Sequence, residues 1–233
     1  MTTGGTNPSG PAAKPPSQTL DRGLRALEIV VSSGHPQSVA DVADQLGLHR
    51  SIVYRMLRTL EEHDLIERDD ENRFRGSPGL LVLARRVFPT LQSAALPELS
   101  VLANQVGKTA FLVVRHCEEA VTVAVVEPRH SLAHVAYRPG MRHTVDRGAP
   151  GLALLAGLPA MPGERPEVAL CRSRGWISTT SEVLPGMSAV AAPVLDPEGN
   201  CPGAVAVVFV TDDDIEALGK AVQETARTIG ATL

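Results

Sequence analysis

The sequence predicts an α+β protein with two folded units, a small helical unit near the N-terminus and a larger unit that contains β-strands. Three observations support this fold class. Apolar residues recur every three or four positions in short segments of residues 20–60. Alternating runs rich in Val and Ala follow beyond residue 108, as is typical of strands. The 233 residues are enough for two small hydrophobic cores.

Composition excludes several classes of protein. The formal net charge of -4 argues against a chain-wide basic coat, so any contact with nucleic acid needs a local basic patch. No apolar run reaches the ~18 residues of a membrane span, and residues 1–18 contain no stretch typical of a secretory signal, so we expect a cytoplasmic protein. Cys117, Cys171 and Cys201 lack CxxC spacing, which favours reduced structural thiols over a disulfide framework or a zinc site.

The N-terminal unit follows a tail that is rich in Gly, Pro, Ser and Thr and is expected to be disordered. A first helix is predicted by an apolar stripe at Leu20, Leu24, Leu27 and Val31. Ser38 can cap a short second helix that ends at Gly47. A third helix is predicted, and its inward face consists of Val53, Met56, Leu57 and Leu60. With a hairpin over residues 65–75, this is the element order of a winged helix-turn-helix.

The third helix also carries a local basic surface. Residues 49–58 contain three arginines and no acid, although the surrounding chain is acidic. At about 100° per residue, Arg55 and Arg58 lie opposite the inward face, where they can donate to phosphates and guanine edges. In the hairpin, Arg73 and Arg75 point to one side and can reach the DNA backbone or minor groove. The alternative is a solvated face on a helical packing unit that does not touch DNA.

A linker helix is predicted over residues 79–92. Its main stripe consists of Leu80, Ala84, Val87 and Leu91. Leu81 and Phe88 widen this stripe beyond what a single packing surface needs. We therefore expect the helix to pack against a second copy of the chain.

The C-terminal unit mixes strands and helices. Strands are predicted over residues 109–116, 121–126, 132–137, 187–195 and 203–210, with a hairpin turn at residues 196–200. Helices are predicted over residues 96–106, from about Pro150, and at the C-terminus. Thr211 and three aspartates open the last helix, whose inward residues are Ile215, Leu218, Val222, Ile229 and Leu233.

Motifs of common enzymes are incomplete. Residues 107–109 (Gly-Lys-Thr) lack the upstream glycine of a phosphate-binding loop, because residue 102 is leucine. His130 and His134 lack the glutamate of an HExxH zinc site. Residues 186–188 lack the closing glycine of a nucleophile elbow. We expect no catalytic activity, no metal and no cofactor.

Residues 24–83 resemble the DNA-binding domain of the IclR family of bacterial regulators. The matching stretches are residues 22–29, 39–43, 47–57 and 73–81. In that family the segment matching residues 50–55 is the recognition helix, and the segment matching residues 79–87 is a linker helix with dimer contacts. The DNA-contacting residues expected here are Ser38, His49, Arg50, Ser51, Ile52, Tyr54, Arg55, Arg58, Arg73 and Arg75.

The resemblance continues through residues 135–140, 147–156, 174–176 and 186–194 and so covers nearly the whole chain after residue 18. It implies a GAF-like α/β effector domain, in which a mainly antiparallel sheet carries helices on one side and a ligand pocket on the other. The effector-binding residues it implies are Ala149, Pro150, Gly151, Thr179, Ala189, Ala206 and Val208. Residues 158–175 form an unusually short segment, so one wall of the pocket is expected to be missing or rebuilt.

The lining residues predict the chemistry of the effector. At positions where several acid-sensing relatives place polar groups, this chain has Ala189, Ala206 and Val208, whose side chains form no hydrogen bonds. A very polar acid would therefore leave its own polar groups without hydrogen-bond partners. We expect a mainly apolar or aromatic molecule, with one carboxylate accommodated by N–H groups at the helix start. The competing interpretation is that these small residues pack a closed core.

The predicted organisation is a tail over residues 1–18, a winged helix-turn-helix over 19–78, a linker helix over 79–92 and an effector domain over 93–233. The first hypothesis is a sequence-specific regulator, dimeric or tetrameric, whose partners are double-stranded operator DNA and a small-molecule effector, with no membrane contact. The second is a winged-helix regulator whose degenerate second domain only dimerises. The third is a GAF-like enzyme or sensor that does not bind DNA.

Overall fold

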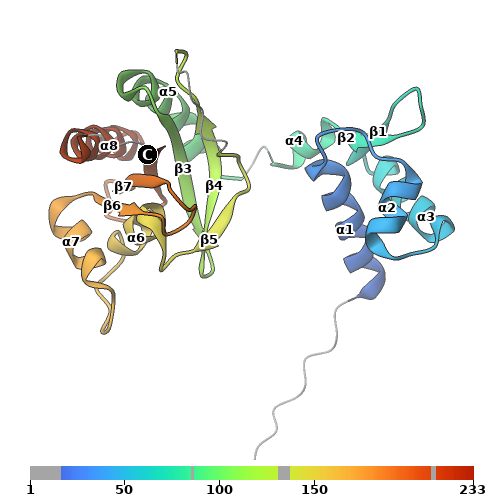
Figure 1. The fold of residues 1–233 in the computed structure, drawn as a ribbon, viewed down its shortest axis with the longest axis horizontal. Helices are drawn as coiled ribbons and strands as arrows, with labels where there is room; N and C mark the ends of the chain where they lie inside the picture. The colour runs from blue at the N-terminus through green and yellow to red at the C-terminus, as the bar shows by residue number, and fades with distance from the viewer. Residues whose placement is uncertain (1–16, 85–86, 131–136, 211–213) are drawn as a thin grey trace, which may run out of the picture. The chain divides into compact units, whose positions relative to one another are not determined.

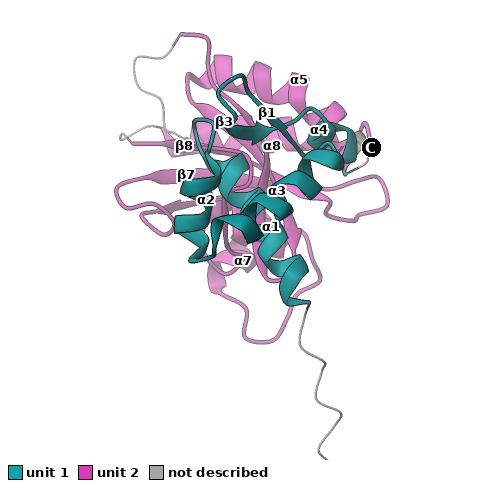
Figure 2. Ribbon diagram, turned by 90° about the vertical axis from the view of Figure 1, so that its right-hand side faces the viewer, with its two compact units in different colours: residues 1–87 teal, residues 88–233 magenta. Residues whose placement is uncertain are grey.

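The computed structural model of the protein describes residues 17–84, 87–130, 137–210 and 214–233. The chain divides into two compact units, residues 1–87 and residues 88–233 (Figure 2). The predicted tail lies outside the described residues except for Ser17 and Gln18, and Gln18 already belongs to the first helix.

Unit 1 has the predicted order of elements (Figure 1). It comprises α1 (Gln18–Ser32), α2 (Val39–Leu46), α3 (Arg50–Glu62), β1 (Ile66–Arg68), β2 (Phe74–Gly76) and α4 (Gly79–Ala84). The strands β1 and β2 form an antiparallel hairpin, and the three long helices pack around Val53, Leu57 and the hairpin's Phe74. This is the architecture of a winged helix-turn-helix.

Local signals set the helix ends in unit 1. The Ser38 hydroxyl accepts a hydrogen bond from the Asp41 N–H at 3.2 Å, and the Asp41 carboxylate accepts one from the Ser38 N–H at 2.9 Å, which completes a capping box. Gly47 closes α2 in the left-handed conformation, with φ of 64°. The turn between α2 and α3 is therefore specified by residues within it.

The apolar stripe predicted for the first helix is offset from the face that the structure buries. Ala26 and Val30 are buried in the core of unit 1, whereas Leu20, Leu24 and Val31 are 62%, 48% and 47% exposed. The helix was predicted correctly, but of its predicted stripe only Leu27 packs against the core. Small residues fill the crossing with α2 and α3, where larger side chains would hold the helices apart.

The predicted linker helix over residues 79–92 is not continuous. The helix α4 ends at Ala84, and α5 (Pro89–Val106) begins at Pro89, with Phe88 before it in the left-handed region at φ of 52°. Proline disfavours helical conformation in the residue before it and suits the first turn of a new helix. Residues 85–86 lie outside the described residues.

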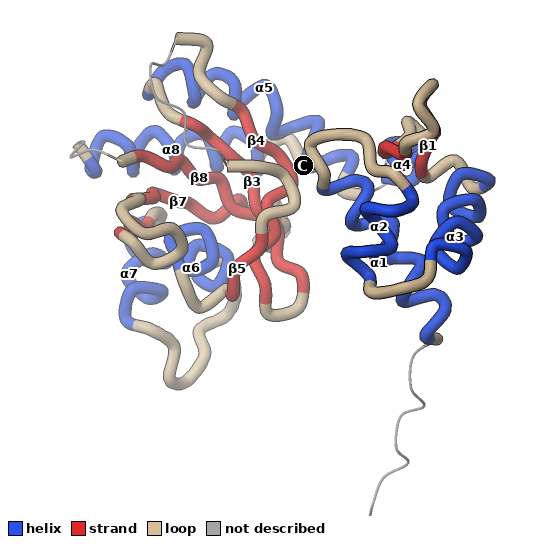
Figure 3. The backbone as a smooth tube through the Cα atoms, turned by 45° about the vertical axis from the view of Figure 1, so that its right-hand side comes forward, coloured by secondary structure: helices blue, strands red, loops and turns tan. Residues whose placement is uncertain are grey.

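Unit 2 is built on one antiparallel sheet with the strand order β5-β4-β3-β8-β7-β6. The strands are β3 (Thr109–His116), β4 (Glu119–Val126), β5 (Arg142–Thr144), β6 (Ile177–Thr180), β7 (Ser188–Val194) and β8 (Gly203–Phe209). Helices α5 and α8 (Ile215–Gly230) cover one face (Figure 3). Helices α6 (Gly148–Ala156) and α7 (Pro166–Arg174) cover part of the other face, beside the pocket described below.

Some details of unit 2 differ from the predictions. The strand expected over residues 132–137 falls outside the described residues, except for Tyr137. The helix predicted over residues 96–106 is the second half of the longer α5. In α8, Asp214 is the N-cap, whereas Thr211 lies outside the described residues. Ile215 was predicted to face inward, but it is the first residue of α8 and is 40% exposed.

The described residues contain no helix that is both long and apolar enough to cross a membrane. Within the same ranges, His, Cys, Asp and Glu side chains form no group of three or more that could hold a metal ion.

Candidate nucleic-acid interface and ligand pocket

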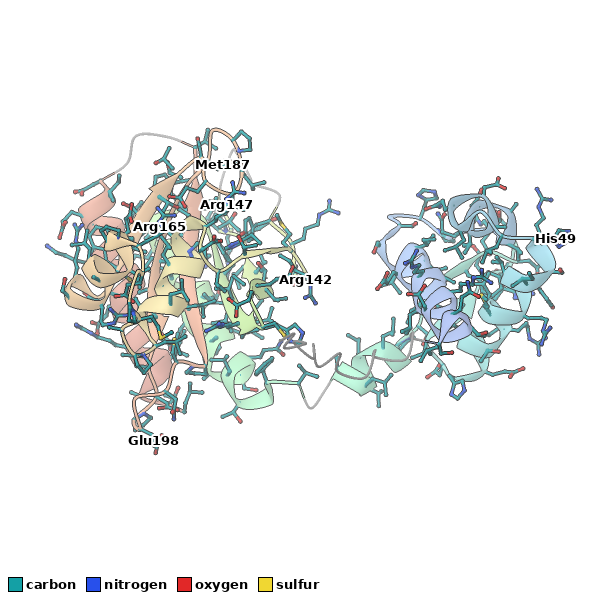
Figure 4. All side chains as sticks on the ribbon, turned by 90° about the horizontal axis from the view of Figure 1, so that it is seen from below. His49, Arg142, Arg147, Arg165, Met187 and Glu198 are labelled. Carbon is teal, nitrogen blue, oxygen red and sulfur yellow. The ribbon has the colours of Figure 1, made fainter. Side chains whose placement is uncertain are left out.

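The outer face of α3 exposes most of the residues predicted to contact DNA. Val53 and Leu57 are buried, while Arg50, Tyr54 and Arg55 are exposed on the same helix. The other exposed residues of the predicted set on this element are His49, Ser51, Ile52 and Arg58. His49, labelled in Figure 4, is exposed and is the N-cap of α3. The helix thus presents a polar face suited to a groove of DNA.

The arginines of α3 and of the hairpin that are predicted to contact DNA fall into two groups. The Arg58 guanidinium lies 3.3 Å from Glu62, and in the hairpin Arg73 and Arg75 pair with Asp69 at 3.0 Å and with Glu67 at 2.7 Å. Within the described residues, Arg50 and Arg55 form no ion pair. These two guanidinium groups therefore reach a phosphate or base without first leaving a carboxylate.

Three residues of the predicted set also have contacts within unit 1, and the sequence predicted only the first of them, the Ser38 cap. Ser38 caps α2 through its hydroxyl. The ring of His49 accepts a hydrogen bond from the Ser51 N–H at 3.3 Å and so caps α3. The Arg58 guanidinium beside Tyr54 lowers the pKa of the Tyr54 hydroxyl. Direct contact of these residues with DNA stays a prediction.

A groove between the start of α1 and α3 adds Arg22, which sequence reasoning missed. The residues lining it are Thr19, Arg22, Ile52, Arg55, Met56 and Thr59. Arg22 stands 33 positions before Arg55, and only the packing of α1 on α3 brings them to one groove. No local pattern in the sequence carries this information.

The second candidate site is a pocket in unit 2 between α6, the sheet and residues 182–189. Pro150, Thr179, Ala189 and Val208 line it, as predicted. Ala149 lies directly behind this lining and donates its backbone N–H to the Thr179 hydroxyl at 2.8 Å. The other lining residues are Phe111, Tyr137, Gly148, Glu182, Val183, Leu184, Met187 and Ser188.

Two of the predicted effector residues pack into the core instead. Ala206 is fully buried on β8. Gly151 lies against the backbone of Val145, so closely that a Cβ there would stand 2.5 Å from the carbonyl oxygen. Neither residue is among those lining the pocket.

The walls of the pocket are mostly apolar, and one wall is aromatic. The rings of Phe111 and Tyr137 stack with centroids 4.1 Å apart, and burial raises the pKa of Tyr137. The lining encloses about 320 Å³ of free space, which includes the opening to solvent. At the centre, the side chains leave room for roughly one or two water molecules. A larger molecule enters only when lining side chains shift.

The polar end of the pocket is the start of α6, which the protein fills with its own side chains. The Gly148 N–H donates to the Glu182 carboxylate at 2.8 Å. Arg165 binds the same carboxylate with two nitrogens, at 3.0 and 3.1 Å, and holds the pKa of Glu182 below its usual range. Arg147 donates to the backbone carbonyl of Glu182. Figure 4 shows Arg147, Arg165 and Met187 close together in unit 2.

The buried thiols of unit 2 are poor nucleophiles. Burial raises the pKa of Cys171 to about 12 and that of Cys201 to about 11. Both therefore remain protonated near neutral pH, which suits the structural role predicted for them.

Comparison with known proteins finds a family model for unit 1 and relatives that align with most of the chain. Residues 19–70 match the IclR helix-turn-helix domain. The HTH-type transcriptional repressor AllR of Klebsiella pneumoniae is 25% identical, with 96% of this chain and 92% of that protein covered. The glycerol operon regulatory protein of Streptomyces griseus is 27% identical, with 82% and 84% covered.

A solved structure shares the fold of both units. It is an IclR homolog from Microbacterium hydrocarbonoxydans complexed with 4-hydroxybenzoate, and it superimposes with a TM-score of 0.78 at 20% identity. The alignment covers 92% of this chain and 98% of that one.

Proposed function

We propose that this chain is a DNA-binding transcriptional regulator of the IclR family. In this proposal Arg50 and Arg55 on α3 read the operator, and the pocket beside α6 holds the effector that modulates binding. The observation that carries the DNA-reading part is the pair of exposed arginines on α3 without a carboxylate partner among the described residues. Arginine at such a position donates two hydrogen bonds to guanine or binds phosphate. Because a similar protein is named as a transcriptional repressor, we propose that this chain represses its target genes. It would do so in the cytoplasm, where its operator DNA is found.

The effector is a mainly apolar or aromatic small molecule. The stacked rings of Phe111 and Tyr137 and the side chains of Leu184 and Met187 provide the matching surface. The bound 4-hydroxybenzoate of the Microbacterium homolog supports an aromatic ligand for this fold.

Footprinting of the chain on its own upstream DNA, with and without aromatic metabolites, tests this function. We expect a protected site that changes in occupancy with one class of metabolite. If the protein protects a site but no ligand changes the footprint or the melting temperature, the alternative in which the second domain only dimerises would be favoured. The absence of salt-dependent binding to any upstream DNA would overturn the regulator itself.

Filling the pocket should abolish the response. In Ala189→Trp the indole occupies the space beside Thr179 and Val208, so we expect normal operator affinity but no ligand-induced shift in melting temperature. Val101→Trp, at a 61% exposed position on α5, serves as the matched control and should keep the response. A full response in Ala189→Trp would remove the effector from this pocket.

We also propose a dimer held by the apolar surface of α4 and the residues that follow it. Leu81, Val82 and Leu83 are 75%, 69% and 67% exposed, and Phe88 is 43% exposed. Runs of exposed apolar residues of this kind mark contacts with another chain. The dimer would bring two copies of α3 to two half-sites of an operator.

Phe88→Asp should convert the dimer to a monomer, because it places a charge within an apolar contact. Sedimentation at micromolar concentration measures the change, and tight operator binding should be lost with it. Leu20→Asp, at an apolar position on α1 that is 62% exposed, is the control and should stay dimeric. Wild-type protein that sediments as a monomer would contradict the proposal.

A further inference from the structure

The start of α6 has no free hydrogen-bond donor for a ligand. The Gly148 N–H donates to Glu182 and the Ala149 N–H donates to Thr179, each at 2.8 Å. The third residue of the helix, Pro150, has no N–H. A helix start is normally a favourable place for an anion because its first N–H groups are unpaired. Here, all three positions are accounted for within the protein.

Glu182 is fixed at this place from two sides. Its two carboxylate oxygens receive the parallel hydrogen bonds of Arg165, a geometry that is among the stronger charge-assisted pairs. Arg165 is in turn held by Glu167 and by the carbonyl of Asp146, at 3.2 and 3.0 Å. A ligand carboxylate would have to displace a tethered carboxylate, whose effective concentration is on the order of millimolar or higher.

The two carboxylates at this point, those of Glu182 and Glu167, already share Arg165 as their cation. Arg165 stands between the carboxylates of Glu182 and Glu167, and Arg147 adds a second guanidinium that contacts the Glu182 backbone. A carboxylate that entered beside Glu182 would bring a further negative charge and find no donor at the helix start. A carboxylate held in a mainly apolar pocket without a cation of its own carries a desolvation cost that an uncharged group does not.

We propose that Glu182 serves as the pocket's own carboxylate and makes this protein select an uncharged aromatic effector over the corresponding carboxylic acid. The inference deepens the proposed function and depends on it. Leu184 and Met187 give way to the ligand by changing rotamer, while Glu182 stays bound to Arg165. Thr179 supplies the polar contact, because its oxygen accepts from Ala149 and its hydroxyl hydrogen remains available as a donor to the ligand.

Two matched probe pairs test the selection: 4-hydroxybenzamide against 4-hydroxybenzoate, and benzamide against benzoate. Each pair has the same ring and differs in charge. We expect the full-length wild type to bind the amides at least about tenfold more tightly than the acids in calorimetric titrations, since an unsatisfied buried group costs on the order of a factor of ten or more.

Glu182→Ala should reverse this order, because it frees the Gly148 N–H and one face of Arg165 for the ligand's carboxylate. We expect acid affinity to rise about tenfold or more over wild type. Glu182→Gln, which is closest in shape, guards against misfolding of the alanine variant and should raise acid affinity in the same direction. Glu167→Gln is the control: it removes the other carboxylate on Arg165, which does not line the pocket, and should keep the preference for amides.

Two results would overturn the inference: wild type that binds the acids as tightly as the amides, or Glu182 variants that gain nothing for the acids. Binding of none of the four probes by any of the proteins would overturn the assignment of the pocket itself, and the inference with it. Operator footprints measured on the same preparations separate that failure from failure of the DNA-reading function.

Discussion

Replacing Arg55 with alanine weakens specific operator binding by about 1–3 kcal/mol if the side chain reads a base, and leaves the fold intact. Arg55 is exposed opposite Val53 and Leu57, and within the described residues it forms no ion pair that the substitution would break. Titration of labelled operator at fixed salt measures the loss, and circular dichroism melting checks the fold.

Arg58→Ala is the matched control on the same helix. Arg58 already pairs with Glu61 and Glu62, so binding DNA requires it to give up partners that it has in the free protein. We expect a smaller loss of affinity than for Arg55→Ala. An equal or larger loss for Arg58→Ala would show that the free-protein ion pairs do not decide which arginines read DNA.

Gly151→Ala should destabilise unit 2 by about 3 kcal/mol, the upper end of the usual cost of overpacking. The added Cβ would stand 2.5 Å from the Val145 carbonyl oxygen and 2.9 Å from its carbon, and neither backbone atom can turn away as a side chain can. The strain pushes α6 from the segment that carries Val145. Thermal melting should fall by roughly 6–12 °C for a unit of this size.

Gly199→Ala is the control that distinguishes the effect of a steric clash from the effect of backbone conformation alone. Gly199 has φ of 85° in the hairpin between β7 and β8, and no atom lies within 4 Å of its added Cβ. Its replacement should lower the free energy of unfolding by only about 1–2 kcal/mol, the cost of holding an alanine in the left-handed conformation. A melting temperature that falls further for Gly199→Ala than for Gly151→Ala would contradict the packing argument.

Elements that depend on local chemistry were predictable from the sequence. The Ser38 and Asp41 cap, the Gly47 turn and the hairpin of unit 1 all form where their residues indicate. The inward face of α1 was predicted only in part, because Leu20 and Leu24 stay exposed while Ala26 and Val30 enter the core and Leu27 packs against it. The linker was predicted as one helix because its apolar residues keep helical spacing on both sides of Pro89. In the structure a new helix begins at this proline.

The sites show the same division. The basic face of α3 follows from helical spacing, but the pairing of Arg73 and Arg75 with acids across or beside the hairpin depends on strand register. In unit 2 the resemblance to a family indicated Pro150, Thr179, Ala189 and Val208. The aromatic wall and Glu182 come from β3 and from irregular segments, which carry no periodic pattern that could assign them to a pocket.

The internal ion pairs of the winged unit have a consequence for how the protein searches a genome. Affinity for random DNA comes almost wholly from cations that replace the counterions condensed on phosphate. Arg58, Arg73 and Arg75 are held by the unit's own carboxylates, so they contribute little to that attraction until a correctly placed α3 brings phosphates close enough to compete. We therefore expect fast release from random sequence and a higher ratio of specific to nonspecific occupancy, although the chain carries a net negative charge.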